Sequence, residues 1–141
     1  MDKLPWEELL RQANHTDTRK RPTHHEDNLQ IQCVKWFGIQ YPKYAPLLHH
    51  SPNGGARSKV EGHIFKQMGV RAGFPDLIFC HPNKHYHALF IEMKTHERGS
   101  RQSDSQKEWQ QRLTSEGYQY TVCKDIDQFI NIIKDYINDK Q

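Results

Sequence analysis

Apolar residues recur every three or four positions in several stretches of the chain, which is the spacing of one helix face. In one stretch Leu29, Cys33 and Phe37 share a face, and the segment ends before Tyr41. In another, Gly69 follows the last apolar position and suits a left-handed helix end. The spacing predicts a short helix near Trp6–Leu10 and longer helices at about 23–40, 56–68, 103–116 and 126–137.

Shorter apolar runs without this spacing predict strands. Leu77–Cys80 and Ala88–Ile91 flank a turn-like segment at 81–85, which indicates a hairpin whose strands are buried on both faces. Tyr118–Cys123 predicts another strand, and the loop-like segment 43–55 has room for a short one at Leu47–His50. Strands interspersed with helices predict an α/β domain with a small mixed β-sheet flanked by α-helices.

The chain has 141 residues, a length that fits one domain with one core. Residues 1–22 are expected to form an extension and residues 23–141 the domain. No apolar stretch is long enough to cross a membrane, and the N-terminus lacks the apolar segment of a secretory signal. Cys33, Cys80 and Cys123 form no closely spaced pair and lie in apolar contexts, so we expect buried thiols and a cytoplasmic protein.

Charged residues interrupt one end of the predicted hairpin. Asp76 opens its first strand, and Glu92 and Lys94 follow the second on one face, because side chains alternate along a strand. A hairpin symmetric about Lys84 places Asp76 opposite Glu92, with Cβ atoms about 4.5–5.5 Å apart. Two such carboxylates beside an apolar core favour a cation between them, and oxygen ligands favour Mg²⁺ or Mn²⁺. The alternative is an ordinary ion pair between Lys94 and one carboxylate.

The same residues resemble a known signature. Pro75-Asp76, separated by fifteen residues from Glu92-Met93-Lys94, is similar to the PD-(D/E)XK nuclease signature. Further blocks resemble the VRR-NUC branch of that superfamily: Ser51–Arg57, Phe65–Val70, Ala72–Leu77, Leu89–Lys94, Ser103 with Gln106, and Gly117-Tyr118. The resemblance covers about residues 24–137 and implies a restriction-endonuclease-like core, in the stand-alone form found in phages and bacteria.

The resemblance also implies an activity and its residues. Asp76, Glu92 and the Met93 carbonyl would bind Mg²⁺ or Mn²⁺, which polarises the scissile phosphate and lowers the pKa of a bound water. Lys94 would orient that water and stabilise the developing negative charge. The implied enzyme is a metal-dependent DNA endonuclease that leaves 5′-phosphate and 3′-hydroxyl ends. Stand-alone members point toward branched DNA, such as four-way junctions, and toward homodimers.

Two polar residues have two interpretations each. The resemblance makes Glu26 a ligand of the metal or of its water, and Gln106 a member of the active-site hydrogen-bond network. Each residue also fits the third position of a capping box, Glu26 with Thr23 and Gln106 with Ser103. Both residues lie on the apolar faces of their helices, which favours the site role.

Candidate DNA contacts lie mainly upstream of the hairpin. The net charge is +3, but residues 1–75 carry +4 and residues 76–141 carry −1. Asn53-Gly54-Gly55 offers backbone N–H groups beside Arg57, which suits a phosphate, and Lys66 could reach the DNA backbone. A tight turn and a solvated helix face are the alternatives. The 10 histidines follow no zinc-site spacing, although His49-His50 could contact DNA.

Three functional hypotheses follow from the sequence. The first is an endonuclease selective for branched DNA, the second a flap or nicking nuclease of the same fold, and the third a non-catalytic DNA-binding module. The intact Asp76, Glu92 and Lys94 argue against the third. A homodimer would use the helix near Trp6–Leu10 or the apolar residues of the last helix, unless these pack within the monomer.

Overall fold

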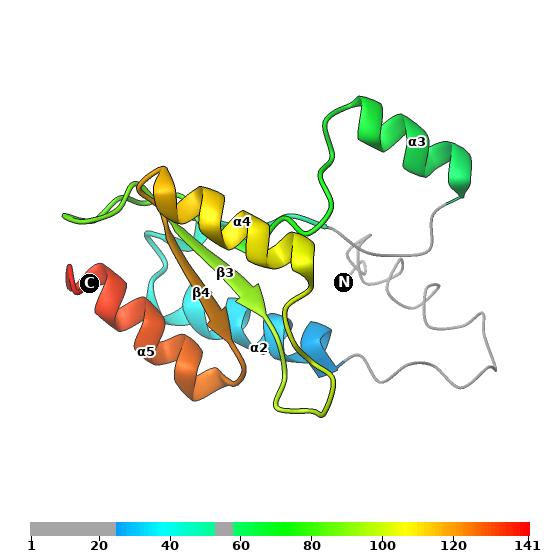
Figure 1. Ribbon diagram of the computed structural model, residues 1–141. Coiled ribbons are helices and arrows are strands. Elements are labelled where there is room, and N and C mark those ends of the chain that lie inside the picture. Colours follow the sequence, from blue (N-terminus) through cyan, green and yellow to red (C-terminus); the bar gives the residue numbers. More distant parts are fainter. Residues whose placement is uncertain (1–24, 53–57) are drawn as a thin grey trace, which may run out of the picture.

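The computed structural model describes residues 25–52 and 58–141. Its helices and strands are interspersed along the chain, and β2 is followed directly by β3 (Figure 1). The elements are α2 (His25–Gln40), the 3-10 turn η1 (Ala45–Leu47), β1 (Leu48–His50), α3 (Lys59–Gln67), β2 (Leu77–Phe79), β3 (Leu89–Met93), α4 (Asp104–Ser115), β4 (Gln119–Cys123) and α5 (Ile126–Ile137). The predicted extension 1–22, its helix and the capping residue Thr23 lie outside the described residues, so the proposed domain boundary stays a prediction.

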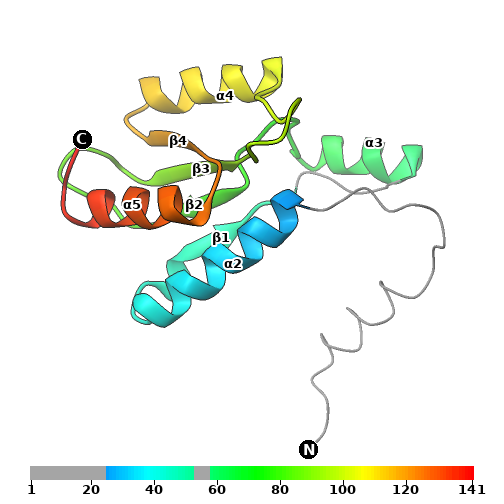
Figure 2. The same ribbon diagram turned by 90° about the horizontal axis from the view of Figure 1, so that it is seen from below.

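The four strands form one mixed sheet in the order β1-β2-β3-β4. β1, β2 and β3 pair antiparallel, whereas β4 runs parallel to β3. α4 covers one face of this sheet, and α2 and α5 cover the other (Figure 2). The predicted α/β fold with a small mixed sheet between helices is therefore confirmed.

The central strand β3 is buried along its whole length, as the continuous apolar run predicts. Leu89, Ile91 and Met93 point into the main core, which α2 and α5 close. Phe90 points the other way, into a smaller core under α4. Because side chains alternate along a strand, the same alternation directs Glu92 toward α4.

The last helix contributes its apolar face to the main core. Phe129, Ile133 and Tyr136 are buried, and Ile126 and Ile137 pack against the same cluster. The sequence left two roles open for this face, a dimer interface and packing within the monomer. The structure shows packing within the monomer.

Helix α3 differs from the other helices. Ser58 accepts a hydrogen bond from the Glu61 N–H at 3.1 Å, so the helix begins at Lys59 and not near residue 56. At its other end Gly69 adopts the predicted left-handed conformation, with φ 104°. None of the α3 residues is buried, and the helix stands apart from the sheet layers in Figure 1.

The expectation of three buried thiols is wrong for one of them. Cys33 and Cys123 are buried, but Cys80 is exposed. The reason is that β2 ends at Phe79, one residue earlier than the apolar run, so Cys80 already belongs to the turn.

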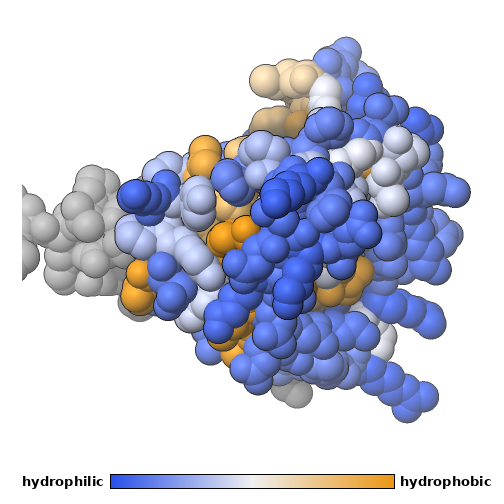
Figure 3. All heavy atoms as spheres, turned by 90° about the vertical axis from the view of Figure 1, so that its left-hand side faces the viewer, coloured by the Kyte–Doolittle hydropathy of each residue, from blue (hydrophilic) through white to orange (hydrophobic). Residues whose placement is uncertain are grey.

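The molecular surface is mainly polar on the face shown in Figure 3, where the apolar patches are separated by hydrophilic residues. This agrees with the low mean hydropathy of the chain, −0.97. Within the described part of the chain, no helix combines the length and apolar character needed to cross a membrane.

Candidate active site

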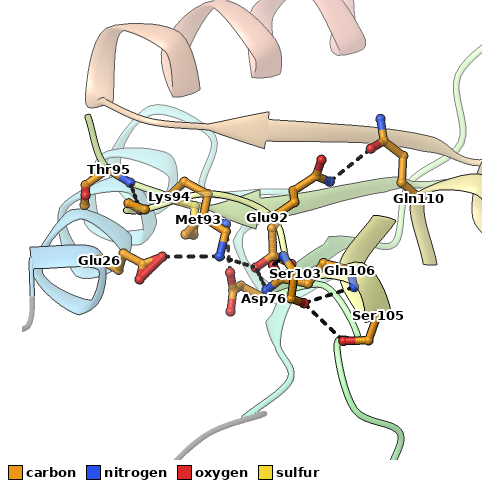
Figure 4. Close-up of polar contacts among 12 residues, drawn as sticks. Glu26, Asp76, Glu92, Met93, Lys94, Thr95, Ser103, Ser105, Gln106 and Gln110 are labelled. Carbon is orange, nitrogen blue, oxygen red and sulfur yellow. Dashed lines mark hydrogen bonds and ion pairs between the residues drawn. The ribbon is translucent and has the colours of Figure 1, made fainter. Parts of the chain in front are cut away.

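A cleft of about 760 Å³ lies among α2, the ends of β2 and β3, and the first turn of α4. Its lining includes Glu26 from α2, Asp76 before β2, Glu92 to Lys94 at the end of β3, and Gln106 from α4. Figure 4 shows these side chains converging from separate elements. The fold thus gathers the predicted residues Glu26, Asp76, Glu92, Met93, Lys94 and Gln106 around one cleft.

Asp76 and Glu92 face each other across the hairpin. Leu77 pairs with Ile91, and continuing this register by one residue places Asp76 opposite Glu92, as symmetry about Lys84 predicts. Asp76 Oδ2 accepts a hydrogen bond from the Met93 N–H at 2.7 Å. The backbone of β3 therefore fixes the direction of one carboxylate relative to the other.

Glu92 is a buried carboxyl group, with only 2% of its surface exposed. Burial, reinforced by the negative charge of Asp76, raises the pKa of Glu92 to about 9. Its Oε1 accepts a hydrogen bond from Gln106 Nε2 at 2.7 Å, while Oε2 has no hydrogen-bond partner among the described residues. A proton or a cation is needed to stabilise this pair of acids.

The oxygen donors here fit a hard divalent cation such as Mg²⁺ or Mn²⁺. Within the described part of the chain, no donor reaches the buried Glu92 Oε2, and Asp76 lies beside Glu92. Among residues 25–52 and 58–141, no three His, Cys, Asp or Glu side chains come together as a metal cluster. Further ligands would therefore be backbone oxygen, such as the Met93 carbonyl, or water.

Lys94 lies between two acids. Its Nζ is 3.9 Å from Glu26 Oε1 and 4.0 Å from Glu92 Oε1, and its side chain is 12% exposed. Its backbone N–H donates to the Cys123 carbonyl at 2.8 Å, which extends the pairing of β3 with β4. Both ion-pair distances are long, so the ammonium group is held in the cleft without closing a tight bridge to either acid.

Glu26 lies in the first turn of α2 and points toward Lys94 (Figure 4). Partial burial raises the pKa of Glu26; the nearby Lys94 opposes this rise and Asp76 adds to it. Thr23, the partner of Glu26 in the predicted capping box, lies outside the described residues.

Gln106 makes both the capping contacts and a contact with a candidate site residue. Its Oε1 accepts from the Ser103 N–H at 2.8 Å, and its own N–H donates to Ser103 Oγ at 3.2 Å, which completes the predicted capping box. The amide nitrogen of the same side chain is then free to donate to Glu92. The cap therefore orients Gln106 toward the carboxylate.

A comparison with known protein families matches residues 12–125 to the VRR-NUC domain. The chain belongs to the VRR-NUC family. A solved structure described as a VRR_NUC domain protein is 37% identical, with a TM-score of 0.71, and the match covers 86% of this chain and 93% of that one. No significant match was found among curated proteins. Membership in this family makes the chain a nuclease-type domain and confirms the predicted resemblance.

The VRR-NUC cleft also contains a histidine that the sequence suggested only as a possible DNA contact. His50, at the end of β1, lines the cleft, and its Nδ1–H donates to the Asp76 carbonyl at 2.8 Å. The Ser51 N–H donates to the same carbonyl at 3.0 Å. Only the pairing of β1 with β2 brings His50 next to Asp76, so no local sequence pattern could have shown this contact.

Of the residues predicted to bind DNA in this VRR-NUC domain, Lys66 lies in the described part of the chain. Asn53, Gly54, Gly55 and Arg57 lie outside the described residues. Lys66 is exposed on α3 and is not among the residues that line the cleft. Its role in binding DNA stays a prediction.

Proposed function

We propose that this VRR-NUC domain is a metal-dependent DNA endonuclease that acts on branched DNA, such as four-way junctions. The observation that carries the proposal is the pair of facing acids, Asp76 and Glu92. Glu92 Oε2 is buried and has no hydrogen-bond partner among the described residues, while Glu92 Oε1 lies 4.0 Å from Lys94 Nζ. When bound, Mg²⁺ or Mn²⁺ supplies Lewis-acid polarisation of the scissile phosphate.

Each residue of the cleft has a role in the proposed hydrolysis. Asp76 and Glu92 would hold the cation, with the Met93 carbonyl and, through water, Glu26 as further ligands. The Lys94 ammonium orients the attacking water and offsets the negative charge that develops on the phosphate. Water forms a bond to phosphorus as the bond to the 3′ oxygen breaks, which leaves 5′-phosphate and 3′-hydroxyl ends. Gln106 keeps Glu92 in place through its amide N–H.

The test is a panel of labelled four-way junction, flap, nicked, single-stranded and duplex DNAs, each incubated with Mg²⁺, Mn²⁺ or EDTA. We expect metal-dependent cleavage, with symmetric cuts across the four-way junction. Cleavage confined to one arm of a flap would favour a flap nuclease. Binding without cleavage of any substrate under any metal condition would favour the non-catalytic module and refute the nuclease proposal.

Lys94→Ala tests the chemistry of the site. Because Lys94 Nζ lies within 4.0 Å of carboxylate oxygens of Glu26 and Glu92, we expect the single-turnover rate to fall about 100-fold or more. Lys134→Ala, on the exposed side of α5, removes a lysine elsewhere and is expected to cleave like wild type. Equal rates for Lys94→Ala and wild type would exclude this cleft as the active site.

The proposal includes a homodimer formed through α3. Val60 and Ile64 on this helix and Met68 at its C-cap recur every four residues, so they form one stripe. They are 70%, 47% and 74% exposed. The apolar face of α5 is already used within the monomer. A two-fold dimer places two active sites symmetrically, which suits paired cuts in a four-way junction.

A further inference from the structure

A second cavity, of about 520 Å³, adjoins the catalytic cleft. Its lining includes the aromatic side chains of Phe65, Phe74 and Trp109, together with Arg71 and Pro52. Phe74 and Pro52 also line the catalytic cleft, so the two cavities are contiguous. We refer to the space lined by these five residues as the aromatic cavity.

The main body of the domain holds two of the three rings in place. Phe74 and Trp109 meet edge to face, with ring centroids 5.0 Å apart and an interplanar angle of 79°. Trp109 Nε1–H also donates to the Ala72 carbonyl at 2.9 Å. Phe65 comes from α3, a separate element. All three rings are only half-buried, so part of each aromatic surface is exposed to solvent.

A cation stands beside this apolar lining. Arg71 is exposed, and its guanidinium group forms no ion pair or hydrogen bond with any residue in the described ranges. Arg71 also lines a neighbouring cavity that contains Arg112, but Arg112 is paired with Glu108 at 3.2 Å. Arg71 is thus the basic side chain of this region that is available to an anion.

Aromatic rings beside an unpaired arginine match the two parts of a nucleotide. Every base has a face that can stack on an aromatic side chain, and its phosphate attracts a guanidinium group. The shared residues Phe74 and Pro52 place the aromatic cavity next to the cleft in which the scissile phosphate is proposed to bind.

We infer that the aromatic cavity receives one unstacked nucleotide of the DNA substrate, with its base on Phe65 and its phosphate on Arg71. The inference rests on the proposed nuclease function and deepens it. Removing a base from an intact duplex costs a few kcal/mol, whereas branches and flaps already contain unpaired nucleotides. A cavity of this kind therefore selects branched or flapped DNA over continuous duplex.

The test is an abasic scan of a flap and a four-way junction substrate. One nucleotide at a time near the branch is replaced by an abasic residue, and binding of the full chain is measured by fluorescence anisotropy with Ca²⁺ in place of Mg²⁺. We expect one position at which loss of the base weakens wild-type binding roughly 5- to 100-fold, the range for stacking on an aromatic side chain. In Phe65→Ala the same abasic substitution should have no further effect.

Three variants on α3 separate stacking from packing. Phe65→Tyr keeps an aromatic ring and should retain the abasic effect, whereas Phe65→Leu keeps apolar bulk and should lose it. His63→Ala removes an exposed ring from the same helix, outside the aromatic cavity, and should behave like wild type. If no abasic position distinguishes wild type from Phe65→Ala, or if Phe65→Leu behaves like wild type, the inference is wrong.

Arg71→Ala examines the phosphate contact. We expect weaker binding and a salt slope, the change of log K with log salt concentration, that is smaller by about 0.7. Lys134→Ala should leave the slope unchanged, and an unchanged slope in Arg71→Ala would overturn the phosphate assignment. These are binding measurements, so an abasic effect without cleavage would support the cavity and refute the nuclease, while cleavage without an abasic effect would do the reverse.

Discussion

At the scale of single residues, Gln106 shows how one side chain joins helix formation to the site. Its amide oxygen completes the capping box of α4, and its amide nitrogen donates to Glu92. The sequence contains the Ser103 to Gln106 spacing, so it predicts the cap. The hydrogen bond to Glu92 does not follow from local spacing, because it depends on β3 lying under the start of α4.

Ser103→Ala and Gln106→Glu separate these two tasks. Ser103→Ala removes only the serine half of the cap, and we expect it to lower the free energy of unfolding by about 1 kcal/mol, with cleavage nearly unchanged. Gln106→Glu keeps an acceptor for the Ser103 N–H but loses the donor to Glu92 and adds a negative charge beside it. We expect cleavage to fall at least tenfold, measured as a single-turnover rate alongside urea denaturation. A similar loss of cleavage in both variants would show that Gln106 acts only as a cap.

His50 is expected to act as a positioning residue. Its Nδ1–H and the Ser51 N–H both bond the Asp76 carbonyl, which fixes the backbone from which the Asp76 carboxylate projects. We expect His50→Ala to weaken Mn²⁺ binding about fivefold, the equivalent of one hydrogen bond of about 1 kcal/mol, by isothermal titration calorimetry.

His50→Asn provides the matched rescue, because the Asn side-chain amide can place an N–H near the position of Nδ1. It should bind Mn²⁺ nearly as tightly as wild type, and His63→Ala should bind it equally well. An asparagine variant as defective as His50→Ala would rule out the positioning role.

At the scale of elements, α3 and α5 show why an apolar stripe does not by itself predict burial. Both helices carry apolar residues at helical spacing, yet α5 buries Phe129, Ile133 and Tyr136, whereas α3 buries none. The difference depends on where the chain returns to the sheet. α5 follows β4 directly and packs on the main core, whereas α3 lies between two connections outside the sheet layers.

The exposed stripe of α3 makes the dimer proposal testable. Ile64→Asp places a charge at the centre of the stripe, so we expect it to convert a dimer to a monomer in analytical ultracentrifugation. Glu61→Gln, on the same helix but off the stripe, should remain dimeric. If Ile64→Asp is still a dimer, or if wild type is a monomer, the proposed α3 interface is incorrect.

The hairpin of β2 and β3 is the element that the sequence specifies best. Its turn at 81–85 and its two apolar runs fix a register symmetric about Lys84, and the structure has that register. Because register determines which side chains lie opposite each other, the facing of Asp76 and Glu92 could be predicted from the sequence alone.

At the scale of the whole molecule, the proposed metal binding at Asp76 and Glu92 is expected to be coupled to folding. The pKa of Glu92 is raised mainly by burial and by Asp76, so the folded protein has to accommodate two acids with limited solvation. A cation that binds only the folded state stabilises it by mass action, by about 2.7 kcal/mol at a concentration of 100 Kd. We therefore expect Mg²⁺ or Mn²⁺ to raise the Tm by roughly 10 °C at that concentration.

Glu92→Gln is the matched variant for this effect. The raised pKa of Glu92 means that folding at neutral pH has to protonate a carboxylate that is ionised in the unfolded chain. Gln removes this cost while retaining an oxygen for the Gln106 N–H, so we expect a higher Tm in EDTA and no further rise with metal. Glu116→Gln, at the exposed end of α4, should shift with metal as wild type does. A full metal-induced shift in Glu92→Gln, measured by differential scanning fluorimetry, would contradict binding by this carboxylate.

The sequence by itself determined the features that depend on near neighbours. Helix spacing, the capping box at Ser103 and the hairpin register involve residues within one turn or one hairpin, so they could be predicted together with Asp76, Glu92 and Lys94. The tertiary structure decided what distant elements bring together. Glu26 on α2 lies close to Lys94, and His50 on β1 bonds to the Asp76 carbonyl. Phe65 on α3 lines the same cavity as Phe74. Such contacts depend on how helices and strands pack, which no local spacing records.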